Sequence, residues 1–188
     1  LRLRLPPHWA RDFFLVSACL ELQHCPEALL RLELLNGAFP SSRWVACSAA
    51  LAHYGARNFD EAQALFEDLL QRVPHRVEGL DAYSNVLYVK VAGAELSALA
   101  RRLAASGDAR SSPEAACAVG NYYSLRGLHE RAVASFRRAL RLSAGGCLGA
   151  WTLMGHEYVE MRNAPAAVAA TRRAVALAPR DYRAGYGL

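Results

Sequence analysis

The chain has 188 residues, of which 53% are hydrophobic and 21% are charged, and its formal net charge is +5. This length and composition suit a globular chain with a sizeable core and exclude the intrinsically disordered class. The longest uncharged stretch, 142–156, is shorter than the roughly 18 apolar residues of a membrane span.

The basic residues also argue against a nucleic-acid-binding protein. They occur as scattered pairs rather than runs, on segments that also carry acids, and Lys90 is the only lysine. The pairs are Arg101/Arg102, Arg137/Arg138 and Arg172/Arg173. We therefore expect no nucleic-acid partner.

Residues 1–8 are predicted to be a leader. Leu1 to Leu5 alternate like a strand, but Pro6 and Pro7 follow and no second segment offers a pairing partner. From residue 9 onward, apolar residues recur at the three- and four-residue spacing of amphipathic helices.

One pattern of small and aromatic residues occurs twice between 113 and 181, and each member returns 35 residues later. The pairs are Gly120 and Gly155, Tyr123 and Tyr158, Ala132 and Ala167, Phe136 and Thr171, and Ala139 and Ala174. Toward the N-terminus, Ala62 and Ala28 continue the anchor alanine at a spacing of 34. A fixed period in the mid-thirties is typical of stacked helix–turn–helix units.

This register predicts a repeat array over 9–188. Its units are expected at about 9–42, 43–76, 77–112, 113–147 and 148–181, with a truncated sixth from 182. The third unit has Leu96 where the anchor alanine belongs, which predicts a distorted hairpin. Because the sixth unit is cut within its first helix, we expect the chain to be part of a longer protein.

The period and its residues resemble the tetratricopeptide repeat (TPR). This resemblance implies an all-α fold, a right-handed TPR superhelix (α-solenoid) of antiparallel helix pairs. Four segments also resemble a narrower family, subunit eight of the anaphase-promoting complex (the cell division cycle protein 23 homologues). They are P-P-H-W-A-R-D-F-F-L (6–15), G-N-Y-Y-S-L-R (120–126), L-G-A-W-T-L-M-G-H-E-Y (148–158) and R-D-Y-R-A (180–184). Six residues match that family although the repeat consensus does not demand them: His8, Asn121, Ser124, Arg126, His156 and Glu157.

The narrower resemblance implies a non-catalytic scaffold of a cell-cycle ubiquitin ligase that acts in mitosis, in the nucleus and cytoplasm. Its implied partners are other subunits of the complex, including sister TPR subunits, and coactivator or small-subunit peptides. It also implies a parent that homodimerises through regions outside this chain, with no membrane contact.

The first helix of each unit is expected to line a groove that binds partner segments. The predicted groove residues are Glu78, Asp81, Asn85, Tyr88, Cys117, Asn121, Ser124, Thr152, His156 and Glu160. Asn85 and Asn121 occupy the same position in adjacent repeats, and an amide that both donates and accepts can clamp an extended peptide backbone. The alternative is that these residues are solvated or tie neighbouring repeats together.

No motif predicts catalysis, a cofactor or a metal site. The five cysteines form no C-x-x-C pair, the histidines lack metal-ligand spacing, and neighbouring carboxylates such as Glu157 and Glu160 lie on amphipathic helices. Two other classes stay open: a co-chaperone-type TPR adaptor, and a TPR region fused to an enzyme. The adaptor needs basic groove residues for an acidic C-terminal peptide, whereas Glu78, Asp81 and Glu114 make this groove acidic.

Overall fold

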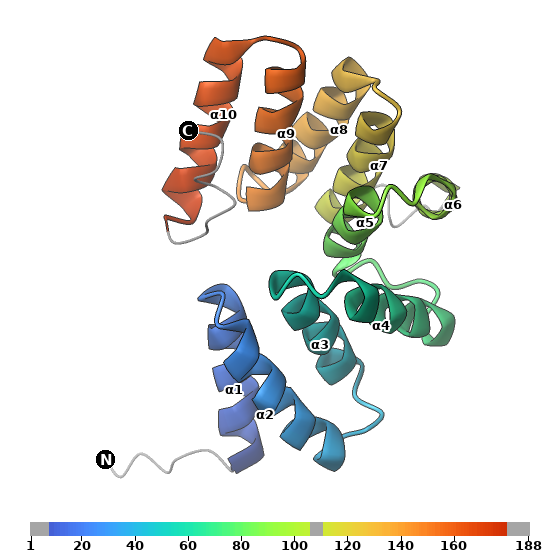
Figure 1. Cartoon of the computed structure of the whole chain (residues 1–188), viewed down its shortest axis with the longest axis vertical. Helices are drawn as coiled ribbons and strands as arrows, with labels where there is room; N and C mark the ends of the chain where they lie inside the picture. Colours follow the sequence, from blue (N-terminus) through green and yellow to red (C-terminus); the bar gives the residue numbers. More distant parts are fainter. Residues whose placement is uncertain (1–7, 106–110, 180–188) are drawn as a thin grey trace. The chain divides into compact units, whose positions relative to one another are not determined.

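The computed structural model describes residues 8–105 and 111–179, and within these ranges all regular structure is helical (Figure 1). The helices are α1 (His8–Glu21), α2 (Cys25–Ala38), α3 (Arg43–Gly55), α4 (Phe59–Arg72), α5 (Leu80–Val89), α6 (Gly93–Ala105), α7 (Pro113–Leu125), α8 (His129–Leu142), α9 (Leu148–Glu160) and α10 (Ala164–Leu177). The predicted all-α class is confirmed.

Consecutive helices pack as antiparallel pairs: α1 with α2, α3 with α4, α5 with α6, α7 with α8, and α9 with α10. The turn inside each pair contains one residue with a left-handed backbone. These residues are Gln23, Arg57, Val91, Gly127 and Arg162, with φ values between 55° and 68°. They recur at intervals of 34 to 36 residues, so the turn follows the same period as the helices.

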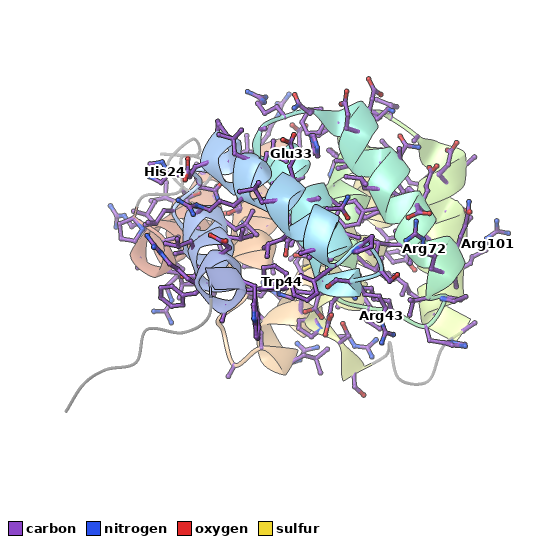
Figure 2. All side chains as sticks on the ribbon, turned by 90° about the horizontal axis from the view of Figure 1, so that it is seen from below. His24, Glu33, Arg43, Trp44, Arg72 and Arg101 are labelled. Carbon is purple, nitrogen blue, oxygen red and sulfur yellow. The ribbon has the colours of Figure 1, made fainter. Side chains whose placement is uncertain are left out.

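The chain divides into two compact units between Arg76 and Val77. The first unit contains α1 to α4, and its core forms where one face of each helix is apolar. One buried cluster of that core comes from α1 to α3 and contains Val16, Ala28, Leu32, Leu35, Val45 and Ala52. From α4, Ala62, Phe66 and Leu69 are also buried. Beside that cluster lies an aromatic group in which the Phe13 ring is 4.7 Å from that of Trp44 and 5.6 Å from that of Phe39. Trp44 remains 36% exposed at the surface of α3 (Figure 2).

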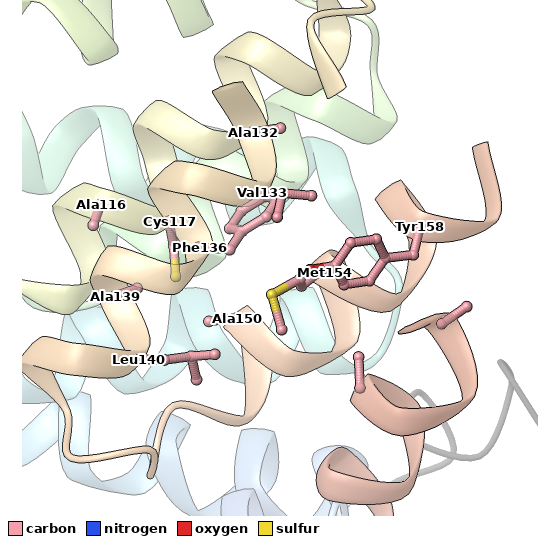
Figure 3. Packing of buried hydrophobic residues seen from close by; sticks show 12 residues of the cluster. Ala116, Cys117, Ala132, Val133, Phe136, Ala139, Leu140, Ala150, Met154 and Tyr158 are labelled. Carbon is pink, nitrogen blue, oxygen red and sulfur yellow. The ribbon is translucent and has the colours of Figure 1, made fainter. Parts of the chain in front are cut away.

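The second unit contains α5 to α10 and carries most of the predicted groove residues. Figure 3 shows part of its core, where the Phe136 ring of α8 lies under the α7–α8 crossing and Met154 lies against the Tyr158 ring. Phe136 is completely buried. A Cβ added at Gly120 would lie 2.4 Å from the Phe136 ring, so the glycine is what allows α7 to approach this ring closely.

Two sequence-based expectations fall outside the described residues. The predicted leader does so apart from His8, which begins α1. The start of the sixth repeat at 182–188 does so completely. Among the described helices, none has the length and apolarity needed to cross a membrane.

Candidate partner-binding surface of the first helices

The first helices of the second unit, α5, α7 and α9, lie next to one another, since α7 contacts both α5 and α9. They hold nine of the ten predicted groove residues, and Glu78 lies just before α5. Four carboxylates and no lysine or arginine occur within these three helices: Asp81, Glu114, Glu157 and Glu160. Glu157 is buried, but Asp81 and Glu114 are half-buried and Glu160 is exposed, so a ligand on this side meets negative charge.

The two predicted clamp residues, Asn85 and Asn121, bond to each other. The side-chain nitrogen of Asn121 donates to Asn85 Oδ1 at 2.6 Å and to Ser84 Oγ at 2.8 Å. Asn121 and Ser84 are both completely buried, whereas Asn85 is half-buried. In this arrangement the Asn121 amide nitrogen ties α7 to α5, as in the alternative interpretation, and only Asn85 reaches the surface.

A second polar chain joins three consecutive first helices. The Ser124 hydroxyl of α7 lies 3.3 Å from the Tyr88 hydroxyl of α5 and donates to Glu157 Oε1 of α9 at 2.5 Å. The other Glu157 oxygen lies 2.8 Å from Nδ1 of His129, at the start of α8. Because the Glu157 side chain is only 5% exposed, these contacts satisfy a carboxylate that water barely reaches.

Cys117 is also buried, at 1% exposure, with its sulfur 3.8 Å from that of Cys147. The hydrogen bond with Cys147 and burial both raise the pKa of the Cys117 thiol. The same hydrogen bond lowers the pKa of Cys147, the more exposed of the two. Cys117 is thus a packed, neutral thiol in the interior and does not contribute to an open groove surface.

The remaining predicted residues differ in how accessible they are. Glu78, His156 and Glu160 are exposed, while Asp81 and Thr152 are half-buried. The Thr152 hydroxyl donates to the Leu148 carbonyl of its own helix at 3.2 Å. The residues best placed to touch a partner are therefore His156 and Glu160 on α9 and Glu78 before α5. No group of three or more metal-ligating side chains occurs in the part of the chain that the structure describes.

Sequence reasoning did not anticipate Ser84 and His129 as members of these networks. Ser84 precedes one predicted clamp residue by a single position, and the helix rotation buries it. His129 belongs to a second helix, so a search restricted to first helices could not find it. The one available signal was Glu157, a charged residue that the repeat consensus does not require.

Comparison with known proteins identifies the repeat and its relatives. The family model described as "Tetratricopeptide repeat" matches residues 113–145, which contain α7 and α8. "Anaphase-promoting complex subunit 8" of Arabidopsis thaliana is 52% identical over 164 residues, covering 87% of this chain and 28% of the relative. The protein of the same name from Dictyostelium discoideum is 43% identical over 168 residues, covering 89% of this chain and 28% of the relative.

The chain is a tetratricopeptide-repeat protein homologous to these subunits. It spans little more than a quarter of the length of the curated relatives that it matches. "Cell division cycle protein 23 homolog" of Homo sapiens is 44% identical over 102 residues, covering 54% of this chain and 17% of the relative.

A solved structure supports the fold independently. The thermophilic TPR protein TTC0263 of Thermus thermophilus superposes with a TM-score of 0.76 at 19% identity, covering 94% of this chain and 95% of that one. At this identity the likeness concerns the fold alone. The predicted TPR and subunit-eight resemblance is thus confirmed by sequence, and the repeat fold by structure.

Proposed function

We propose that the parent protein is a TPR subunit of the anaphase-promoting complex and that this segment acts as a non-catalytic scaffold within it. The observation that carries the proposal is the 52% identity over 164 residues to a protein named as subunit 8 of that complex. Such a subunit works in the cell cycle and in ubiquitin conjugation, with sister subunits as its partners and the nucleus as its place of action.

The buried polar chain supports a scaffold role. Residues Tyr88, Ser124 and Glu157 connect α5, α7 and α9 through interior hydrogen bonds, so these three helices are held in one register. A surface that holds its shape loses less entropy when a partner segment binds. We infer that the first-helix side presents a preformed surface to neutral or basic segments of coactivators or small subunits.

The test is affinity purification of the full-length protein from cells, followed by mass spectrometry of the co-purifying proteins. We expect sister TPR subunits and a cullin-like subunit in stoichiometric amounts. Recovery of chaperones without these subunits would favour the co-chaperone-type adaptor and would overturn the proposal.

A matched pair of variants then tests the first-helix surface. The double variant His156→Ala and Glu160→Ala should reduce recovery of partner segments at least threefold without changing the melting temperature, because both residues are exposed on α9. The control is His24→Ala with Glu33→Ala, which removes the same two side-chain types from the surface of the first unit (Figure 2). Equal recovery with both variants would exclude this part of α9 as a contact surface.

A further inference from the structure

The arginine pairs of the second unit recur with the period of the repeats. Arg101/Arg102 of α6, Arg137/Arg138 of α8 and Arg172/Arg173 of α10 follow one another at intervals of 36 and 35 residues. All six side chains are exposed, and Figure 2 shows Arg101 extending away from the ribbon. In the fold these pairs therefore occupy one equivalent position on three successive second helices.

The second helices of this unit are strongly basic. Together α6, α8 and α10 carry eight arginines and two glutamates, and α10 carries no acid at all. The fold does not require this charge, because the second helices of the first unit, α2 and α4, carry six acids and two arginines. The basic charge thus belongs to this unit specifically.

A groove of about 460 Å³ lies between two of these basic helices. Arg137 and Arg141 of α8 line one side, Arg173 of α10 lines the other, and Trp151 and Met154 of α9 form part of the floor. Alanines of α10 supply much of the second wall: Ala166, Ala169 and Ala170. The result is an apolar floor with arginines on both sides.

Contacts within the groove fix its aromatic residues. The Trp151 indole N–H donates to the Gly145 carbonyl at 3.0 Å, and the Arg173 guanidinium lies 5.8 Å from the centre of its ring. Arg137 donates to the Tyr158 hydroxyl at 2.8 Å. These contacts hold the Trp151 and Tyr158 rings in place along the groove.

The groove arginines are not engaged by the ion pairs seen elsewhere in the described residues. Those ion pairs include Arg31 with Asp12 and Glu27, Arg72 with Asp68, and His129 with Glu157. Arg137, Arg141 and Arg173 take part in none of them. Each guanidinium thus keeps donors that a carboxylate can accept from in a bidentate arrangement.

We propose that the groove between α8 and α10 docks an acidic segment of a partner polypeptide. An aliphatic side chain of the segment rests on Trp151 and Met154, and its carboxylates pair with the arginines of α8 and α10. Charge alone is a weak anchor here, since exposed ion pairs contribute little. The apolar floor supplies the remaining affinity and selects a polypeptide over a nucleic-acid backbone.

The equivalent groove between α6 and α8 lacks the side chains that distinguish the groove between α8 and α10. It has a volume of about 240 Å³ and contains one arginine, Arg138, with no aromatic residue. Ala116 stands there at the position of Trp151, one period earlier. The repeat therefore supplies the groove, and the particular side chains of α8, α9 and α10 make one copy suited to an acidic segment.

The experiment measures fluorescence anisotropy of labelled 12-residue peptides with the full-length protein at physiological salt. The probes are a Glu/Asp peptide with two leucines, the same peptide with serines in place of the leucines, a lysine version of the first, and a 12-nucleotide single-stranded DNA. We expect the acidic leucine peptide to bind at least fivefold more tightly than each of the other three.

Two charge-reversal variants then locate the site. Arg141→Glu with Arg173→Glu should weaken the acidic leucine peptide at least tenfold, because both residues line the groove. The control, Arg138→Glu with Arg172→Glu, makes the same charge change at neighbouring exposed positions outside it and should weaken binding less than threefold. Melting temperatures of both variants verify folding.

Three results would overturn the proposal: equal losses in the two variants, absence of binding to the acidic leucine peptide, or tighter binding of the DNA. The first would mean that net charge alone attracts the peptide. The last would mean that the arginine ladder serves a nucleic acid. None of these outcomes bears on assembly of the parent with sister subunits, so the two proposals fail separately.

Discussion

The α7–α8 and α9–α10 pairs share a period of 35 residues but fill their crossings differently. In α7–α8 a completely buried Phe136 ring packs against Gly120, and a Cβ on that glycine would come within 2.4 Å of the ring. In α9–α10 the corresponding residues are Thr171 and Gly155, and the added Cβ would lie 3.1 Å from the Thr171 hydroxyl. The same backbone plan thus tolerates a tight aromatic crossing and a looser one.

The difference shows which residues the repeat needs and which it leaves open. A small residue on the first helix is common to both pairs, whereas the residue facing it varies in size. The looser pair places other aromatic residues, Trp151 and Tyr158, beside the groove that carries the arginines. The helix pair with the looser crossing is thus also the pair whose surface groove contains aromatic residues and arginines.

The largest expected effect is the loss of the aromatic ring. Phe136→Ala should lower the free energy of unfolding by about 3–5 kcal/mol, because it leaves a cavity where a completely buried side chain stood. Thr171→Ala at the matching position should cost only about 1 kcal/mol, since it removes a hydroxyl bonded to the Ala167 carbonyl of its own helix. Urea unfolding of both variants measures the difference, and equal losses would contradict the comparison.

The glycines at the two crossings give the next effect. Gly120→Ala should carry an overpacking cost of about 1–3 kcal/mol against Phe136, which the roughly 1 kcal/mol that alanine gains in a helix offsets only in part, so that the protein is destabilised on balance. Gly155→Ala should be close to neutral, because its contact is looser and the helical gain offsets it. Thermal unfolding of the two variants checks this order. A stabilised Gly120→Ala protein would show that the ring moves aside freely.

The polar link between the two pairs comes third. Ser124→Ala should cost about 1–3 kcal/mol, because the Glu157 carboxylate then loses a donor while it stays buried. The control is Ser135→Ala, which removes a hydroxyl that donates to the Arg131 carbonyl within its own helix. A double-mutant cycle with Glu157→Gln isolates the coupling. An additive result would mean that this bond does not hold α7 and α9 in register.

Sequence alone predicted the helical content and the pairing because the relevant residues obey a fixed period. The two helices of a pair cross at Gly120 and Phe136, and again at 155 and 171. Such a helix crossing depends on the sizes of residues that recur at a fixed spacing in the sequence. The resemblance to the subunit-eight family could also be seen in the sequence. Residues such as Ser124 and Glu157 match that family at positions where the repeat consensus demands no particular residue.

The surface was harder to predict because it depends on helix rotation, which a one-dimensional pattern leaves open. A turn of a helix by a few tens of degrees separates exposed Glu160 from buried Glu157, only three residues away. The two asparagines were placed correctly at equivalent positions, yet one is buried against the other's helix. Along the sequence the arginine pairs look scattered. Their common position on successive second helices becomes apparent only when the repeats are aligned with one another.

The smallest expected effect concerns the two cysteines that connect these pairs, Cys117 of α7 and Cys147 just before α9. The raised pKa of Cys117 keeps its thiol protonated well above neutral pH, whereas the lowered pKa of Cys147 favours the reactive thiolate. Iodoacetamide at pH 8 should therefore label Cys147 at least tenfold faster than Cys117, as read by peptide mass spectrometry. Cys117→Ser retains a donor toward Cys147 and should change its labelling rate less than Cys117→Ala, which removes that donor. Faster labelling of Cys117 would mean that α7 separates from the start of α9 more readily than its burial implies.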